Sequence, residues 1–118
     1  MNVVHLNGYI LQNFELSSSG VAKVVITKEI LEEFNVKVSD ASLLVSALGS
    51  VKGIKAWVFF IEEENTIRVR LRSKGPVINT VAKKFNGGGH PLASGASIYS
   101  WDEVDLVMAE LEKVCTAE

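Results

Sequence analysis

Residues 54–72, IKAWVFFIEEENTIRVRLR, decide the fold. Ile54 to Ile61 is almost continuously apolar, which is typical of an interior strand that is covered on both faces. Residues 62–65, EEEN, make a polar turn, and Thr66 to Arg72 alternates apolar and basic side chains as a second strand would. We therefore expect a β-hairpin within a sheet.

Further strands and helices flank this hairpin. Apolar, β-branched runs predict strands over Val3–Leu11, Val21–Ile26 and Ala93–Tyr99. Capping residues and apolar spacing predict helices from Thr27 to Asn35, from Ser39 or Asp40 to Gly49, from Pro76 to Phe85, and from Asp102 onward. The order of these elements predicts an α/β (α+β) fold, with a single mixed sheet of about five strands flanked by helices and one domain over residues 1–118.

Composition narrows the class of protein. The chain has 118 residues, of which 47% are hydrophobic, so it can bury one core. Its net charge of −2 argues against a domain that binds long nucleic acid through phosphates, so any phosphate site must be local. The single cysteine, Cys115, has helical spacing to Leu111 and is expected to be buried. Because neither a signal peptide nor a bilayer-spanning run is evident, we expect a cytoplasmic protein without membrane contact.

The arginines of the second hairpin strand are the first candidates for chemistry. Side chains alternate faces along a strand, so Arg68, Arg70 and Arg72 share one face and stand about 7 Å apart. Such a face either meets water and pairs with the glutamates of the turn, or it meets phosphates. Pairing with glutamates is the simpler interpretation for Arg68, whereas Arg70 stays open between the two.

A strand is predicted to end, and a helix to begin, just after Arg72. The free N–H groups of a helix N-terminus attract anions, and Pro76 suits the first position of a helix. Arg72, the Ser73 hydroxyl and these amides could therefore converge on a phosphate. The candidate substrate-binding residues in this part of the chain are Arg70, Arg72, Ser73 and Lys74.

A second candidate region is the stretch NGGGHPLASG, residues 86–95. One glycine would suffice to end the preceding helix. Three in a row, Gly87, Gly88 and Gly89, indicate a backbone that a ligand approaches closely or one that needs several positive φ angles. His90 would then project from a rigid bend and either donate to a phosphate or shuttle a proton. The alternative is a buried histidine bonded to a backbone carbonyl.

A metal site is not expected within this chain. The two histidines, His5 and His90, are far apart in sequence, and there is no D-x-D pair, no H-x-x-x-H and no cysteine pair. His5 is expected to be a strand residue without a role. A self-contained metallohydrolase is therefore not supported.

Two segments taken together carry a family resemblance: RLRSKG at residues 70–75 and INTVAKKFNGGGHPLASGASI at residues 78–98. They resemble the C-terminal, DHH-associated domain of the DHH phosphoesterase superfamily, nearest to the bifunctional oligoribonucleases and pAp phosphatases of Gram-positive bacteria. In this family an N-terminal domain carries the Asp-His-His motif and two metal ions, typically manganese. The resemblance implies that the present chain is the C-terminal part of a longer enzyme, with the metals in the missing domain and no cofactor bound here.

The resemblance also implies roles and partners. By position, Arg72 and Ser73 match substrate contacts at a strand end, Gly87 to Gly89 match the loop beside the substrate backbone, and His90 matches the histidine that faces the active cleft. The whole enzyme would hydrolyse short oligoribonucleotides and 3′-phosphoadenosine 5′-phosphate (pAp), while this chain alone would be inactive. The implied partners are a short RNA or nucleotide and the N-terminal DHH domain, and a homodimer of the full-length protein is compatible.

Three points stay open after this comparison. The same glycine-histidine loop would suit a lobe of a cyclic-dinucleotide phosphodiesterase. A non-catalytic RNA-binding module like that of alanyl-tRNA synthetases is a further alternative, although the net charge argues against it. Many relatives have serine where this chain has Arg70, so the role of Arg70 is undecided.

Overall fold

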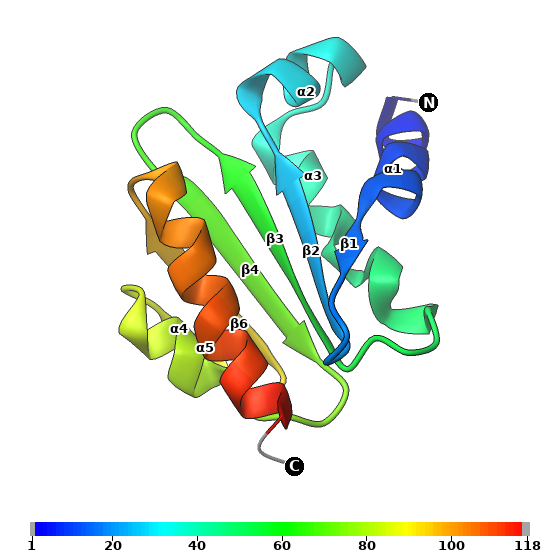
Figure 1. The fold of residues 1–118 in the computed structure, drawn as a ribbon. Helices are drawn as coiled ribbons and strands as arrows, with labels where there is room; N and C mark the ends of the chain where they lie inside the picture. The colour runs from blue at the N-terminus through cyan, green and yellow to red at the C-terminus, as the bar shows by residue number, and fades with distance from the viewer. Residues whose placement is uncertain (1, 117–118) are drawn as a thin grey trace.

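The computed structural model describes residues 2–116, which form one open sheet with helices on both faces (Figure 1). The described strands are β1 (Glu15–Leu16), β2 (Val21–Ile26), β3 (Ala56–Glu62), β4 (Ile67–Ser73), β5 (Gly88–His90) and β6 (Ala93–Ile98). Their order across the sheet is β1-β2-β3-β4-β6-β5, with β2 parallel to β3 and the other neighbours antiparallel. The predicted mixed sheet is confirmed, with six strands in the described part rather than about five.

Helices cover the two faces of the sheet unequally. On one face lie α1 (Asn2–Asn13), α2 (Lys28–Phe34), α3 (Val38–Ser42) and the 3₁₀ helix η1 (Leu43–Ser50). On the other face lie α4 (Asn79–Lys84) and α5 (Val104–Thr116), the latter preceded by the 3₁₀ helix η2 (Trp101–Glu103). Figure 1 shows α4 and α5 in front of the sheet and the N-terminal helices on its far side.

The predicted interior strand is confirmed as β3. Val58 and Phe60 are buried beneath α4 and α5, whereas Trp57 and Phe59 are buried beneath the N-terminal helices. The indole Nε1 of Trp57 donates to the Val45 carbonyl of η1 at 2.6 Å, which satisfies its polar group inside the core. The strand is continuously apolar because each of its faces meets a different apolar layer.

The N-terminal helices leave most of this face of β4, β6 and β5 uncovered, although η1 approaches β4. Apolar side chains of β4 and β6 are buried under α4 and α5, but no residue of these strands belongs to the cluster under the N-terminal helices. The residues on the uncovered side are Arg68, Arg70 and Arg72 on β4, Ala93, Gly95 and Ser97 on β6, and Gly88 and His90 on β5. We call this uncovered side the open face.

The prediction of a strand over Val3–Leu11 is wrong, because these residues belong to helix α1. Leu6 and Ile10 are fully buried and one helical turn apart, and Val3 packs on the same side. His5 is therefore an exposed helix residue rather than a strand residue. Two-residue β1, which follows α1 and pairs with β2, was not predicted.

The boundaries of two other helices differ from those predicted. Helix α4 begins at Asn79, not at Pro76, which is buried in the preceding turn. The second predicted helix is divided into α3, which begins at Val38, and η1, which runs to Ser50. The cap at Thr27 is confirmed, since its side chain accepts the Ile30 N–H at 3.2 Å.

The C-terminal helix is confirmed. Val107, Leu111 and Cys115 are buried along one side of α5 and complete the layer over β4 and β6. Across residues 2–116 we find no helix that is both long and apolar enough to cross a membrane.

Candidate functional site

The strand register brings the main candidate residues together on the open face. On neighbouring strands Arg72 pairs with Ala93 and Ala93 with His90, so these three residues form one row across the sheet. The next row is Arg70, Gly95 and Gly88. Because directly paired residues project to the same side, the two arginines and His90 share a face. The middle position is Ala93 in the first row and Gly95 in the second, so no large side chain lies between the charged groups. We call the surface formed by these small residues the floor.

His90 is exposed and its orientation is fixed by local hydrogen bonds. Its Nδ1 accepts the Leu92 N–H at 3.0 Å, so in the neutral ring the proton resides on Nε2, which is left to donate. Its backbone carbonyl accepts the Ser94 hydroxyl at 2.7 Å. The alternative of a buried histidine bonded to a backbone carbonyl is therefore wrong.

Arg72 is held at the edge of the floor by backbone acceptors. Its Nη1 donates to the Leu71 carbonyl at 2.9 Å and reaches the Ser94 carbonyl at 3.5 Å. Burial lowers the pKa of the Arg72 guanidinium, and the positive charge of Arg70 lowers this pKa further. Both effects disfavour the charged form in the folded chain, and a bound anion would oppose both.

Arg70 stands in the neighbouring row and lacks a partner for one nitrogen. Its Nε is buried and has no hydrogen-bond acceptor among residues 2–116. A Cβ placed on Gly95 would stand 3.5 Å from Nη1 of Arg70, so the guanidinium lies against Gly95 on the adjacent strand. Leaving a buried donor without an acceptor costs about 1–3 kcal/mol of folding free energy, so the position of Arg70 is unfavourable in this respect.

Arg68 differs from the two other arginines. Its Nε lies 3.4 Å from Oε2 of Glu63 in the hairpin turn. The pairing predicted for Arg68 is confirmed, whereas no ion pair to Arg70 or Arg72 occurs within the described part of the chain.

The three adjacent glycines, Gly87 to Gly89, lie in three different surroundings. A Cβ on Gly87 would stand 2.0 Å from the Gly95 carbonyl oxygen, so only glycine allows this contact between backbones. Gly89 has a φ of +140°, which other residues rarely adopt. A Cβ on Gly88 would meet nothing within 4 Å, so no contact inside the chain requires glycine there. Gly88 is the glycine on the open face, where its missing side chain leaves room for a ligand.

The family follows from a comparison with known domains. The model of the DHHA1 domain matches residues 20–117. This chain belongs to the DHHA1 family.

Relatives of this DHHA1 domain agree with the resemblance found in its sequence. It is 63% identical over 115 residues to the bifunctional oligoribonuclease and PAP phosphatase NrnA of Bacillus subtilis, covering 98% of this chain and 37% of the relative. A solved exopolyphosphatase-related protein of Bacteroides fragilis matches with a TM-score of 0.84 at 30% identity, over 95% of this chain and 34% of that chain. The chain thus spans little more than a third of these relatives.

A more distant structure shows the same fold. The pGpG-specific phosphodiesterase PggH of Vibrio cholerae matches with a TM-score of 0.69 at 14% identity, over 98% of this chain and 39% of that chain. At this identity the likeness concerns the fold of the DHHA1 domain alone.

Two predicted contacts of the DHHA1 domain, Ser73 and Lys74, do not join the open face. Ser73 projects to the opposite side of β4 and is 9% exposed; its hydroxyl donates to the Pro76 carbonyl at 2.5 Å and accepts the Gly75 N–H at 3.1 Å. Lys74 extends its Nζ to the Val51 carbonyl at 2.7 Å. Arg72 and Ser73 therefore do not converge on one anion, because consecutive strand residues face opposite sides.

The predicted anion site at a helix N-terminus stays a prediction, and one of the N–H groups at this end is already occupied. The N–H of Ile78, just before α4, donates to the Pro91 carbonyl at 2.8 Å. This bond and the bond from Asn79 Nδ2 to the Gly89 carbonyl at 3.1 Å fasten the glycine-rich loop to α4. The start of α4 thus positions the glycine-rich loop.

Two small residues, Ala93 and Gly95, were missed by the sequence analysis as parts of the site. They form the floor between β4 and β5. Their signal in the sequence is the segment ASGAS at residues 93–97, which places small side chains at five consecutive positions of a strand. Such a strand offers close approach to its backbone.

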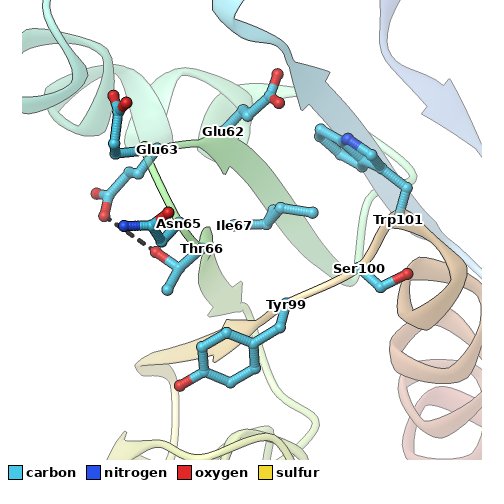
Figure 2. Close-up of a pocket in the computed structure, with 9 residues that line it drawn as sticks. Glu62, Glu63, Asn65, Thr66, Ile67, Tyr99, Ser100 and Trp101 are labelled. Carbon is cyan, nitrogen blue, oxygen red and sulfur yellow. Dashed lines mark hydrogen bonds between the residues drawn. The ribbon is translucent and has the colours of Figure 1, made fainter.

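The DHHA1 domain also has a pocket of about 330 Å³ at the other end of the sheet. Figure 2 shows it between the β3–β4 turn, with Glu62 and Glu63, and the start of η2, with Tyr99 and Trp101. The carboxylate of Glu62 accepts the Lys28 N–H at 2.9 Å, and Glu63 pairs with Arg68. These acidic groups hold the turn together, and their charge makes the pocket unsuitable for phosphate.

Within residues 2–116 there is no group of three or more histidine, cysteine or acidic side chains placed to hold a metal ion. The groups gathered on the open face are cationic or donate hydrogen bonds. Their chemistry fits an anion such as a phosphate and does not fit a cation.

Proposed function

We propose that this DHHA1 domain is the substrate-binding lobe of a metal-dependent phosphoesterase that hydrolyses short oligoribonucleotides and pAp. The observation that carries the proposal is the grouping of Arg70, Arg72 and His90 around a floor of alanine and glycine, on the part of the sheet that lies outside the core beneath the N-terminal helices. The printed activities of the Bacillus relative, at 63% identity, support the choice of substrates.

The residues of this chain would bind and orient the substrate. Arg72 and Arg70 would neutralise the negative charge of a phosphate, and Nε2 of His90 would donate a hydrogen bond to one of its oxygens. Gly88 would let the sugar-phosphate backbone approach the strand. A substrate held in this way is positioned for attack rather than attacked by any group of this chain.

The hydrolytic chemistry is assigned to the N-terminal DHH domain of a longer protein. Metal ions in that domain, manganese by resemblance, would supply the nucleophile and Lewis-acid chemistry. Residues 2–116 form no metal site, so their part in the reaction would be to bind and orient the substrate. A cytoplasmic location and a homodimer of the full-length protein stay predictions from the sequence.

The division of roles between the two domains predicts that the 118-residue chain is inactive by itself. Incubated with manganese and a dinucleotide or pAp, the pure chain should release no mononucleotide, because residues 2–116 offer no group of side chains that could hold the metal. It should still bind pAp weakly, with NMR shifts confined to the open face, above all at Gly88, His90 and Gly95. The longer protein, purified in the same way, is the positive control.

Two results would contradict this prediction. Metal-dependent turnover by the pure chain would place the catalytic centre within it and refute the proposed division. Shifts confined to the acidic pocket at Tyr99 and Trp101 would move the binding site to the other end of the sheet.

A further inference from the structure

We propose that Arg70 and Arg72 hold two neighbouring phosphate groups of one substrate, so that Arg70 selects substrates that carry a second phosphate. This inference rests on the proposed function and deepens it, because it assigns a specificity-determining residue within the same site. Arg70 lies in the row formed with Gly95 and Gly88, which is next to the row that contains Arg72 and His90.

The first support is the number and spacing of free guanidinium groups on β4. Residues two apart on a strand are separated by about 7 Å, a distance similar to that between neighbouring phosphates along a nucleotide chain. Arg68 is occupied by Glu63, whereas Arg70 and Arg72 have no carboxylate partner among residues 2–116. β4 therefore offers two arginines, Arg70 and Arg72, for contacts with phosphates. The charge of the third, Arg68, is already neutralised by Glu63.

The second support is the surroundings of Arg70. Its guanidinium lies against Gly95, and the neighbour of Gly95 in the same row is Gly88, whose missing side chain leaves open space. A phosphate could thus lie in the Arg70 row without meeting a side chain from β6 or β5. Arginine can bind a phosphate end-on through its two Nη groups, which lie beyond the buried Nε.

The third support is the repulsion between the two arginines. Burial lowers the pKa of Arg72, and the charge of Arg70 lowers it further, as expected for two cations two residues apart on one face of a strand. A ligand with two phosphates relieves this repulsion at both groups, whereas a ligand with one phosphate satisfies one row and leaves the other positive.

The inference distinguishes substrates by their number of phosphates. A 5′-phosphorylated dinucleotide such as pApA carries two neighbouring phosphates, and pAp also carries two on one nucleoside. The unphosphorylated dinucleotide ApA carries one. Arg70 should therefore contribute more to the hydrolysis of pApA than to that of ApA.

The experiment compares kcat/KM for pApA and ApA in the longer metal-loaded protein. In Arg70→Ser the ratio of the two values should fall about tenfold, the effect expected from the loss of one charge-assisted contact. Arg70→Lys should recover part of the ratio. Arg68→Ser is the matched control, because Arg68 is on the same strand and face but paired with Glu63; it should change the ratio less than twofold. The two kcat/KM values of each variant are measured on the same preparation. A smaller fraction of folded protein lowers both values equally and therefore cancels in their ratio.

A second measurement needs no activity. In the 118-residue chain the ratio of Kd for AMP to Kd for pAp, measured by NMR titration, should fall severalfold in Arg70→Ser and stay unchanged in Arg68→Ser.

The outcomes separate this inference from the proposed function. If Arg70→Ser leaves both ratios unchanged while Arg72→Ala lowers both activities, the second-phosphate role is overturned and the substrate-binding lobe stands. If Arg70→Ser lowers both activities equally, Arg70 is a general contact and its selectivity is refuted. If Arg72→Ala and His90→Ala both leave the hydrolysis of both substrates unchanged, the proposed function itself fails.

Discussion

Replacing Arg72 or His90 by alanine in the longer protein is expected to lower kcat/KM for short oligoribonucleotides by about tenfold to a thousandfold each. Both residues lie in one row of the open face, on either side of Ala93. Each substitution removes a donor that is already oriented by backbone contacts, Arg72 by two carbonyls and His90 by the Leu92 N–H. The measurement is steady-state kinetics with metal in excess.

Matched controls separate the site from a general loss of charge. Arg68→Ala removes an arginine from the same strand and face, but one that pairs with Glu63. His5→Ala removes the other histidine, which is exposed on α1. Both controls should retain activity within about twofold. Wild-type rates in Arg72→Ala and His90→Ala together would discard the site.

The substitution His90→Gln distinguishes the two roles left open for this residue. Glutamine keeps a hydrogen-bond donor but cannot transfer a proton at neutral pH. If His90 binds phosphate, His90→Gln should retain more activity than His90→Ala. Equal losses in the two variants would instead favour a proton shuttle.

Local chemistry in the sequence was sufficient to predict the strands at the centre of the sheet. β3 is buried on both faces, so it is continuously apolar; β4 is buried on one, so it alternates. Strand β6 and helix α5 were recognised for the same reason. Pairing of Arg68 with a turn glutamate was also predictable, because a hairpin brings them together without any other part of the chain.

The first helix was mistaken for a strand because its pattern is ambiguous. Leu6 and Ile10 have helical spacing, but Val4 and Leu11, which are exposed, add apolar residues between and beyond them. Gly8 then suggested a break, although it meets nothing within 4 Å and the helix passes through it. Burial of Leu6 and Ile10 in a core shared with α2, α3 and η1, which the sequence pattern does not display, decides in favour of the helix.

The site was predictable in part. Arg72, His90 and the glycines were recognised, but their common row depends on β6 lying between β4 and β5, an order that does not follow the sequence. The misplacement of Ser73 was avoidable. The alternation that puts Arg72 on the open face puts Ser73 on the other side once β4 is extended by one residue.

Gly87→Ala is expected to lower the free energy of unfolding by about 3 kcal/mol, at the upper end of the usual cost of overpacking. The new Cβ would stand 2.0 Å from the Gly95 carbonyl oxygen and 2.6 Å from Cα of Ala96. Both are backbone atoms of β6, so no side chain can rotate away, and β5 would have to separate from β6. Urea denaturation of the 118-residue chain measures the loss.

Gly88→Ala is the matched control, at the next residue along the chain, which is the first residue of β5. Its Cβ would meet nothing within 4 Å, so the free energy of unfolding should stay within about 1 kcal/mol of the original value. Gly88→Val should likewise fold, yet its larger side chain would rise from the floor between Arg70 and His90. In the longer protein we expect Gly88→Val to lower kcat/KM by about tenfold or more through displacement of the substrate.

The two adjacent glycines should therefore differ in kind, with Gly87 required for stability and Gly88 for activity. Equal losses of stability in Gly87→Ala and Gly88→Ala would mean that general strain of the glycine-rich loop, and not close approach of two backbones at Gly87, explains the glycines. Full activity in a folded Gly88→Val variant would show that no substrate passes over this part of the open face. Either result would require a different account of why three glycines precede His90.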